Sequence, residues 1–198
     1  MYTVIPLGEL LSEEYDENIL EQAFKKFSCQ REPDLENFLM KKAILYEKSD
    51  FGKTYLILDT DELKHQNFVI MAYFTISYKG INISNLSNKQ RRKMLGMYPG
   101  RDHIDTIGAY LIGQLGRSDS YTSEQLPGYI ILSECYHAIS IAAKAIGGRM
   151  LVLECREGMY EKFYQKHGFL KFHDQLSKDN LYTLYQKIDF RDYWNLKK

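Results

Sequence analysis

The chain has 198 residues, of which 44% are hydrophobic and 26% charged, and its 26 basic side chains equal its 26 acidic ones in number. A chain of this length can bury one sizeable core, whereas zero net charge argues weakly against a protein whose main task is to grip nucleic acid. No apolar run approaches the roughly 20 residues that span a bilayer, and the acidic residues soon after Leu7 do not fit a signal peptide. We therefore expect a cytoplasmic protein with no membrane partner.

The spacing of cysteines and histidines predicts neither a disulfide framework nor a metal site. Cys29, Cys135 and Cys155 are far apart and form no Cys-x-x-Cys pair, and the five histidines show no clustered ligand spacing. We expect the cysteines to be reduced packing residues and the protein to use no metal.

The N-terminal half predicts two amphipathic helices followed by a hairpin. Apolar residues recur at helical spacing over Glu14–Phe27 and Asp34–Tyr46. Aromatic and β-branched residues dominate Thr54–Asp59 and Asn67–Ser77, as in strands, and a charged connection joins them. The pattern leaves open whether Thr3–Leu7 forms a further strand.

A run of basic residues follows the hairpin, between Asn85 and Pro99-Gly100. It contains Lys89, Arg91, Arg92 and Lys93. Such a run is most often a solvated face, and we expect that here.

The C-terminal half predicts alternating strands and helices. We expect strands over Ile107–Leu115, Met150–Cys155 and Leu181–Ile188, and a long helix over Gly128–Ile146. The order α-α-β-β-β-α-β-α-β-β, without a linker or repeat, predicts one α/β domain over residues 1–198.

A short motif follows the strand that ends at Cys155. Met159, Tyr160, Phe163, Tyr164 and His167 share a helix face, and a glycine stands next, where a C-cap glycine belongs. The chain then becomes extended again. A purely structural interpretation makes Tyr164 a core aromatic.

This strand, helix and Phe163-Tyr164-x-x-x-Gly168-Phe169 pattern resembles the GNAT superfamily of coenzyme A-dependent N-acetyltransferases. The resemblance covers most of the chain. It implies a mixed, mostly antiparallel sheet flanked by helices on both faces, and acetyl-coenzyme A as co-substrate. It also implies that Tyr164 lies beside the coenzyme A sulfur and donates a proton to the departing thiolate.

The N-terminal half looks like the branch of that superfamily that contains bacterial toxin acetyltransferases. Phe27-Ser28-Cys29, the run Asp34 to Leu39, Thr54-Tyr55-Leu56 and Tyr73-Phe74-Thr75 carry this likeness. The branch includes enzymes that acetylate the amino group of aminoacyl-tRNA. Most of these residues are also ordinary core apolars.

The resemblance places the coenzyme A site at the end of the fourth strand and the start of the long helix. The residues that it implies are Leu115, Gly116, Arg117, Gln125, Leu126, Pro127, Gly128 and Tyr129. N–H groups at a helix start form an anion site for a pyrophosphate, and Gln125 and Gly128 match the family pattern. Ile130 replaces a small residue and Pro127 removes a donor, so an ordinary loop–helix junction is the alternative.

In the enzyme that the resemblance implies, an amine attacks the thioester directly and a backbone N–H between Leu115 and Arg117 stabilises the oxyanion. The base is left unassigned among Glu134, Glu154 and Glu157. Glu157 and Tyr160 replace an asparagine and an alanine of the family; we favour a surface position for Glu157 and packing for Tyr160.

Several functions and partners stay open. The acceptor is a small-molecule or protein amine, or an aminoacyl-tRNA, with its specificity in the loops Ser77–Arg101 and Arg156–Gly158. A non-catalytic GNAT-fold binding or regulatory protein is the main alternative, and an aromatic-rich interaction module ranks last. Tyr182, Tyr185 and Trp194 pack either on the core or on a second subunit of a homodimer.

Overall fold

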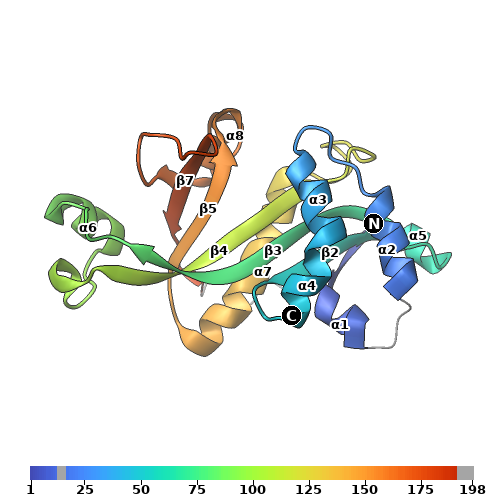
Figure 1. Cartoon of the computed structure of the whole chain (residues 1–198), viewed down its shortest axis with the longest axis horizontal. Helices are drawn as coiled ribbons and strands as arrows, with labels where there is room; N and C mark the ends of the chain where they lie inside the picture. Colours follow the sequence, from blue (N-terminus) through green and yellow to red (C-terminus); the bar gives the residue numbers. More distant parts are fainter. Residues whose placement is uncertain (13–16, 191–198) are drawn as a thin grey trace. The chain divides into compact units, whose positions relative to one another are not determined.

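The computed structural model describes residues 1–12 and 17–190 (Figure 1). Trp194 and the first residues of the predicted helix from Glu14 lie outside the described residues. The chain divides into two compact units, each of which is described by itself. The first comprises Met1–Ser77 and Ile112–Ser140; the second comprises Tyr78–Leu111 and the described residues from Ile141 onward.

The described strands form a seven-stranded sheet in the order β1-β2-β3-β4-β5-β7-β6. The strands are β1 (Tyr2–Pro6), β2 (Lys53–Asp59), β3 (Ile70–Asn82), β4 (Thr106–Arg117), β5 (Met150–Arg156), β6 (Leu170–Lys171) and β7 (Leu181–Lys187). β2 pairs antiparallel with both β1 and β3, and β7 pairs antiparallel with both β5 and β6. The N-terminal strand left open by the sequence is therefore present, and the predicted hairpin is confirmed.

Helices cover both faces of the strands in the first unit. They are α1 (Leu7–Ser12), α2 (Glu17–Lys26), α3 (Pro33–Lys41), α4 (Ala43–Lys48), the short α5 (Thr60–Lys64) and the first part of α7 (Gly128–Ile146). Leu56, Leu58 and Tyr73 share a buried core with α1 to α4. Because strand side chains alternate between faces, Tyr55 turns away from that core and lies near Cys135 of α7. Figure 1 shows α3 and α7 on opposite sides of the strands.

The predicted single helix Asp34–Tyr46 is wrong, because the chain leaves the helix at Lys42. Lys42 has φ −124° and ψ −28°, and α4 begins at the next residue. Leu39 and Ala43 are both buried on the two sides of the break, and the rings of Phe38 and Tyr46 meet edge to face at 5.3 Å. Helical spacing of apolar residues continues across the break, so the sequence pattern does not reveal it.

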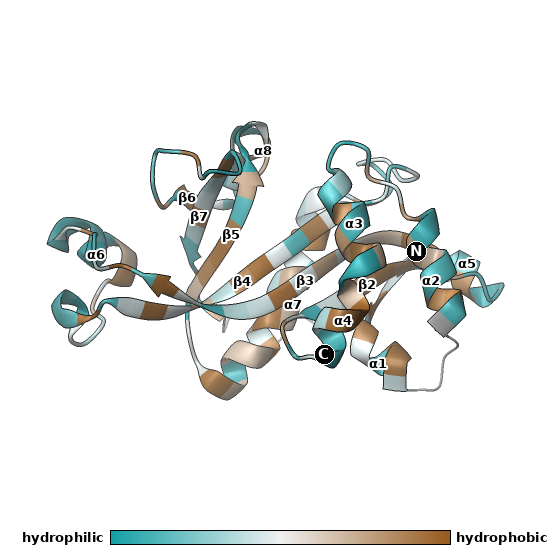
Figure 2. Cartoon of the chain, in the orientation of Figure 1, coloured by the Kyte–Doolittle hydropathy of each residue, from teal (hydrophilic) through white to brown (hydrophobic). Residues whose placement is uncertain are grey.

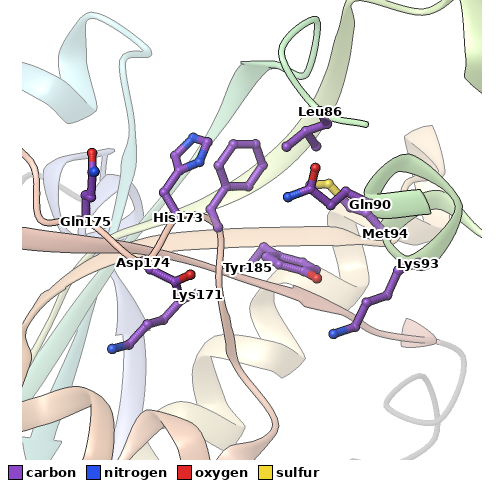
Figure 3. Close-up of a pocket in the computed structure, with 10 residues that line it drawn as sticks. Leu86, Gln90, Lys93, Met94, Lys171, His173, Asp174, Gln175 and Tyr185 are labelled. Atoms are coloured by element: carbon purple, nitrogen blue, oxygen red, sulfur yellow. The ribbon is translucent and has the colours of Figure 1, made fainter. Parts of the chain in front are cut away.

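The second unit contains α6 (Asn88–Leu95), α8 (Glu157–Lys162) and two 3₁₀ turns, η1 (Arg101–His103) and η2 (Tyr164–His167). Met94 and Leu95 of α6 are buried with Ile83, Met150 and Val152 in one apolar cluster. Figure 2 shows the other residues of α6 as largely hydrophilic. A cavity of about 420 Å³ lies in this unit, between α6 and the chain that leaves β6 (Figure 3).

The basic run of α6 differs from the predicted solvated face at Arg91. Ser87 and Gln90 form a reciprocal N-terminal cap, so the run is a capped helix rather than a loop. Lys89, Arg92 and Lys93 are exposed, as predicted. Arg91 is only 6% exposed, because its guanidinium bonds to backbone carbonyls of the same segment.

None of the described helices is both long enough and apolar enough to cross a membrane.

Candidate active site

The end of β4 is packed against the N-terminal helices. Gly116 is buried, and a Cβ atom there would overlap the side chain of Leu35 on α3. The Leu35 carbonyl in turn accepts a 2.7 Å hydrogen bond from the Tyr73 hydroxyl of β3. Leu115 and Arg117, on either side of Gly116, are half-buried. Gly116 therefore serves close packing in this structure, and its neighbours remain accessible.

The backbone N–H groups after Gly116 face different edges of β4. The Ser118 N–H donates to the Met71 carbonyl of β3 at 2.8 Å. Because successive N–H groups of an extended strand point in opposite directions, the Arg117 N–H faces away from β3. By the same alternation the Leu115 N–H also faces away from β3, so Leu115 and Arg117, and not Gly116, are the candidate donors of the predicted oxyanion segment.

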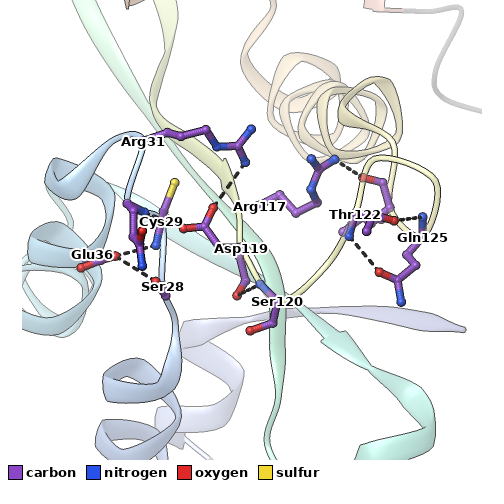
Figure 4. Close-up of polar contacts among 12 residues, drawn as sticks. Ser28, Cys29, Arg31, Glu36, Arg117, Asp119, Ser120, Thr122 and Gln125 are labelled. Carbon is purple, nitrogen blue, oxygen red and sulfur yellow. Dashed lines mark hydrogen bonds and ion pairs between the residues drawn. The ribbon is translucent and has the colours of Figure 1, made fainter.

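The Arg117 side chain connects β4 to the loop before α7 (Figure 4). Its Nη1 donates to the carbonyl of Leu126 at 2.8 Å, and Leu126 is 1% exposed. Its Nε is buried, with no partner among the described residues. Burial lowers the pKa of Arg117, with nearby Arg31 as the next cause, although a guanidinium stays charged at neutral pH. The arginine thus sets the path of the predicted pyrophosphate loop.

A turn over Thr122–Gln125 precedes α7. The Thr122 N–H donates to Oε1 of Gln125 at 2.8 Å, and the Gln125 N–H donates to the Thr122 hydroxyl at 3.3 Å. The exposed Gln125 side chain thus shapes its own turn, as in a capping box. Figure 4 draws both bonds between the two residues.

α7 begins at Gly128, as predicted. The Ile130 N–H donates to the Pro127 carbonyl at 3.0 Å. The first N–H groups of a helix have no partner within it, so Gly128 and Tyr129 present N–H groups at the positive end of the helix dipole. Gly128 is half-buried and the Tyr129 side chain is 56% exposed. This arrangement can receive an anion, with one donor fewer because of Pro127.

Asp119 fixes the start of the same loop. Its N–H donates to the Ser28 carbonyl at 2.7 Å, and its carboxylate accepts from the Gln30 N–H at 2.6 Å and pairs with Arg31 at 3.4 Å. Glu36 accepts from the Cys29 N–H at 2.5 Å in the same connection between α2 and α3. The long loop is therefore braced at its first residue.

Asp119, Glu36 and Arg31 were not predicted as site residues. Asp119 meets Gln30 and Arg31 from 89 and 88 residues away, and the bond of Glu36 to the Cys29 N–H depends on the turn between α2 and α3. The only signal at Asp119 was an acidic residue in the loop that follows the predicted strand Ile107–Leu115. At Glu36 it was an acidic residue in the first turn of a helix.

Tyr164 lies in the second unit, at the start of η2, and is 7% exposed. Its ring meets Phe163 at 5.0 Å and Phe169 at 5.4 Å, both edge to face. The Phe169 N–H donates to the Tyr164 carbonyl at 3.1 Å, and Gly168 adopts φ 82° as the predicted left-handed cap. Ring packing and backbone bonds therefore hold Tyr164 in one position.

The predicted continuous helix through Tyr160 and Tyr164 is wrong at one point. α8 ends at Lys162, and Phe163, with φ −132°, separates it from η2. Tyr160 packs against Tyr182 at 6.1 Å, which confirms a packing role. Glu157 is exposed, as favoured, and accepts from the Tyr182 hydroxyl at 3.0 Å.

The three candidate bases lie in different surroundings. Glu134 is 9% exposed and accepts from the Tyr2 hydroxyl at 2.9 Å within the first unit. Glu154 and Glu157 are exposed in the second unit. Burial, then the bond to Glu134, raises the pKa of Tyr2 to about 12. The contact with Tyr2 gives Glu134 a structural role.

The predicted packing role of the cysteines is confirmed. Cys29, Cys135 and Cys155 are buried and free. Burial raises the pKa of Cys155 to about 11 and also raises the pKa of Cys135 well above its usual value, which keeps both as neutral thiols. Across the described ranges, no three His, Cys, Asp or Glu side chains cluster as a metal site would require.

These elements define the GNAT-type α/β fold that the sequence predicts. Among solved structures, the chain is similar to one described as a bacterial toxin, with 14% identity, a TM-score of 0.74, and coverage of 100% of this chain and 97% of that one. It is similar to AtaT complexed with acetyl-methionyl-tRNAfMet, with 16% identity, a TM-score of 0.65, and coverage of 92% and 94%. It is also similar to AtaTR bound with AcCoA, with 18% identity, a TM-score of 0.64, and coverage of 92% of each chain.

No protein-family model and no curated protein sequence matches this chain. The low identities mean that the similarity concerns the fold.

Proposed function

We propose that the protein is an N-acetyltransferase that moves the acetyl group of acetyl-coenzyme A to a primary amine by direct attack. The observation that carries this proposal is the shared fold with AtaTR bound with AcCoA over 92% of both chains. The intact Phe163-Tyr164 and Gly168-Phe169 pairs support it, and the buried, ring-packed Tyr164 is in keeping with a fixed role.

In this proposal, the end of β4 and the start of α7 hold the co-substrate. The N–H groups of Gly128 and Tyr129 receive the pyrophosphate, because they stand at the first turn of a 19-residue helix. The Arg117 guanidinium holds Leu126, and with it the approach to that helix. A backbone N–H of Leu115 or Arg117, both of which face away from β3, stabilises the developing oxyanion.

The amine nitrogen attacks the thioester carbon, and a C–N bond forms as the C–S bond breaks. The departing thiolate takes the proton of the Tyr164 hydroxyl, and the amine gives up its own proton to water or a base. A general acid of this kind contributes roughly 10² to 10⁴ in rate. The acceptor amine is a small molecule, a protein amine or an aminoacyl-tRNA; the AtaT complex with acetyl-methionyl-tRNAfMet supports the last of these.

Two observations favour a second candidate, a GNAT-fold protein that binds coenzyme A weakly and does not turn it over. Pro127 removes one N–H donor beside the helix start. The Oε1 of Gln125 is engaged within its own turn, where it accepts from the Thr122 N–H. Binding and turnover of acetyl-coenzyme A separate the two candidates.

The test is a calorimetric titration of acetyl-coenzyme A into the wild type and Tyr164→Phe, with a thiol-release assay on a panel of amines and aminoacyl-tRNA. We expect both proteins to bind with similar affinity, because phenylalanine keeps the ring contacts, and turnover to fall about 10²-fold or more in Tyr164→Phe. Tyr160→Phe is the matched control and should keep turnover. Absence of binding by a folded wild type rejects the acetyltransferase; binding without turnover on any amine favours the second candidate.

A further inference from the structure

Positive charge is concentrated in one segment of this neutral chain. Residues 77–101 contain six basic side chains and no acidic one: Lys79, Lys89, Arg91, Arg92, Lys93 and Arg101. The rest of the chain then carries 20 basic and 26 acidic side chains. The segment is therefore the strongest local attraction for an anion in the sequence.

The segment is an ordered surface rather than a loose loop. Arg91 turns its guanidinium inward, where it bonds to the carbonyls of Ser84, Leu86, Arg101 and Ile104. Its neighbours on α6 remain exposed. The short, capped helix thus presents Lys89, Arg92 and Lys93 to solvent.

The cavity of about 420 Å³ is lined by Lys93 and Gln90 of α6, within the same unit. Phe172 and Tyr185 supply aromatic walls, with ring centroids 6.2 Å apart, and Gln175 supplies an exposed amide. Lys93 and Lys171 also line it, and Figure 3 shows the Tyr185 ring between them. The ammonium of Lys171 lies 3.7 Å from the ring of Tyr182, so a π face holds its position.

We propose that this cavity is a binding site for one unpaired nucleotide of a single-stranded RNA, with the flanking phosphates on Lys89, Arg92 and Lys93. Aromatic faces stack bases and amides hydrogen-bond to base edges, whereas basic side chains along a groove follow the backbone. The volume is in the range of small-ligand sites. An acidic peptide would use the ammonium groups alone, would meet the Asp174 carboxylate that also lines the cavity, and would leave the aromatic and amide walls without a function. A carboxylate can, in contrast, accept a hydrogen bond from the amino group of a base.

The residues of this site are distinct from those proposed for the co-substrate, so RNA binding is tested separately from acetyl-coenzyme A binding. Both properties can therefore be measured on the same protein.

The test is fluorescence anisotropy with a labelled single-stranded RNA of about a dozen nucleotides, between about 50 and 200 mM salt. The variant Lys89→Glu/Lys93→Glu changes two exposed side chains. The control Lys26→Glu/Lys41→Glu makes the same change in charge on exposed residues of α2 and α3. We expect at least 10-fold weaker binding for the first variant, with a log–log salt slope shallower by about 1.4. The control should change affinity less than about threefold.

Cross-linking locates the site without relying on a variant that must fold. RNA with 4-thiouridine, irradiated with the wild type, should cross-link to peptides that contain Phe172 or Tyr185. Cross-links confined to other peptides would overturn the assignment. So would equal losses in the two charge variants, competition by polyglutamate as effective as that of unlabelled RNA, or equally tight binding of free AMP.

Acetyl-coenzyme A titration of each variant keeps the two proposals apart. If the wild type binds acetyl-coenzyme A but no RNA, the RNA site is rejected and the acetyltransferase stands. If the wild type binds RNA at the cavity but no acetyl-coenzyme A, the acetyltransferase is rejected and the RNA site stands.

Discussion

The guanidinium of Arg91 donates a hydrogen bond to the carbonyl of Ile104, 13 residues further along the chain. The same side chain bonds to the Ser84 carbonyl at 3.1 Å and lies 3.8 Å from the carboxylate of Asp105. One arginine therefore joins the end of β3, the start of α6 and the approach to β4. A charged side chain at 6% exposure is tolerated because its donors are satisfied.

Replacement of Arg91 by methionine should destabilise the second unit by about 3 kcal/mol or more, because several carbonyls lose a charged donor together. Urea denaturation measures the change in the free energy of unfolding. Hydrogen exchange should show faster exchange at amides between Ser84 and Ile104. Arg92→Met is the control at an exposed neighbour, and should stay within about 0.5 kcal/mol of wild type. Equal effects of the two variants would contradict the structural role of Arg91.

The contrast between Arg91 and its neighbours shows where sequence patterns stop being informative. The long helix Gly128–Ile146 was predictable, because apolar residues recur at helical spacing and a proline and glycine mark its start. The burial of Arg91 was not, since it depends on carbonyls that only the folded path of residues 84–104 brings together. Asp119 is similar: its partner Gln30 is 89 residues away.

The motif Phe163-Tyr164-x-x-x-Gly168-Phe169 was also predictable only where its structure depends on local sequence. Gly168 takes the left-handed cap conformation that few other residues adopt, so its place in the motif is a local signal. The break at Phe163 is not local in this sense, because the apolar spacing continues through it. Tyr164 was therefore found by its motif, while its place on a 3₁₀ turn came from the structure.

Gly116→Ala should destabilise the first unit by about 1 to 3 kcal/mol, because the new methyl group overlaps Leu35 in a packed core. Gly113→Ala is the control: a Cβ there meets only the Thr75 carbonyl, at an ordinary contact distance of 3.9 Å. Thermal unfolding compares the two. The double variant Gly116→Ala/Leu35→Ala should lose less unfolding free energy than the two single variants together, because the smaller side chain at position 35 makes room for the new methyl group. Strict additivity would show that the overlap is not the cause.

Stability should fall as pH rises from about 10 to about 12. Burial, together with the bond to Glu134, raises the pKa of Tyr2 to about 12, and burial with the bond to Asp59 does the same for Tyr121. A folded-state pKa above the unfolded value of about 10 means that the folded protein holds these protons more tightly. The stabilisation is complete below about pH 10 and is lost as pH rises through the folded pKa.

Denaturant unfolding at a series of pH values measures this dependence. Tyr2→Phe and Tyr121→Phe should each be less stable than wild type near neutral pH. Above about pH 10 the free energy of unfolding should decline less steeply in each variant, because one titrating hydroxyl is gone. An unchanged slope in both variants would mean that the two hydroxyl bonds do not link protonation to folding.

Arg117→Met should weaken acetyl-coenzyme A binding about 10-fold, or about 1.4 kcal/mol, while the protein stays folded. The guanidinium donates to the Leu126 carbonyl one residue before Pro127, so its loss releases the loop that positions the start of α7. Calorimetric titration measures affinity and a melting curve checks folding. Arg31→Met removes an equal charge from the same region. Among the described residues the exposed Arg31 side chain forms an ion pair with Asp119, and surface pairs contribute about 0 to 1 kcal/mol. If Arg31→Met weakens binding as much as Arg117→Met does, positive charge alone explains the affinity. If only Arg117→Met does so, the affinity depends on the bond that holds the loop.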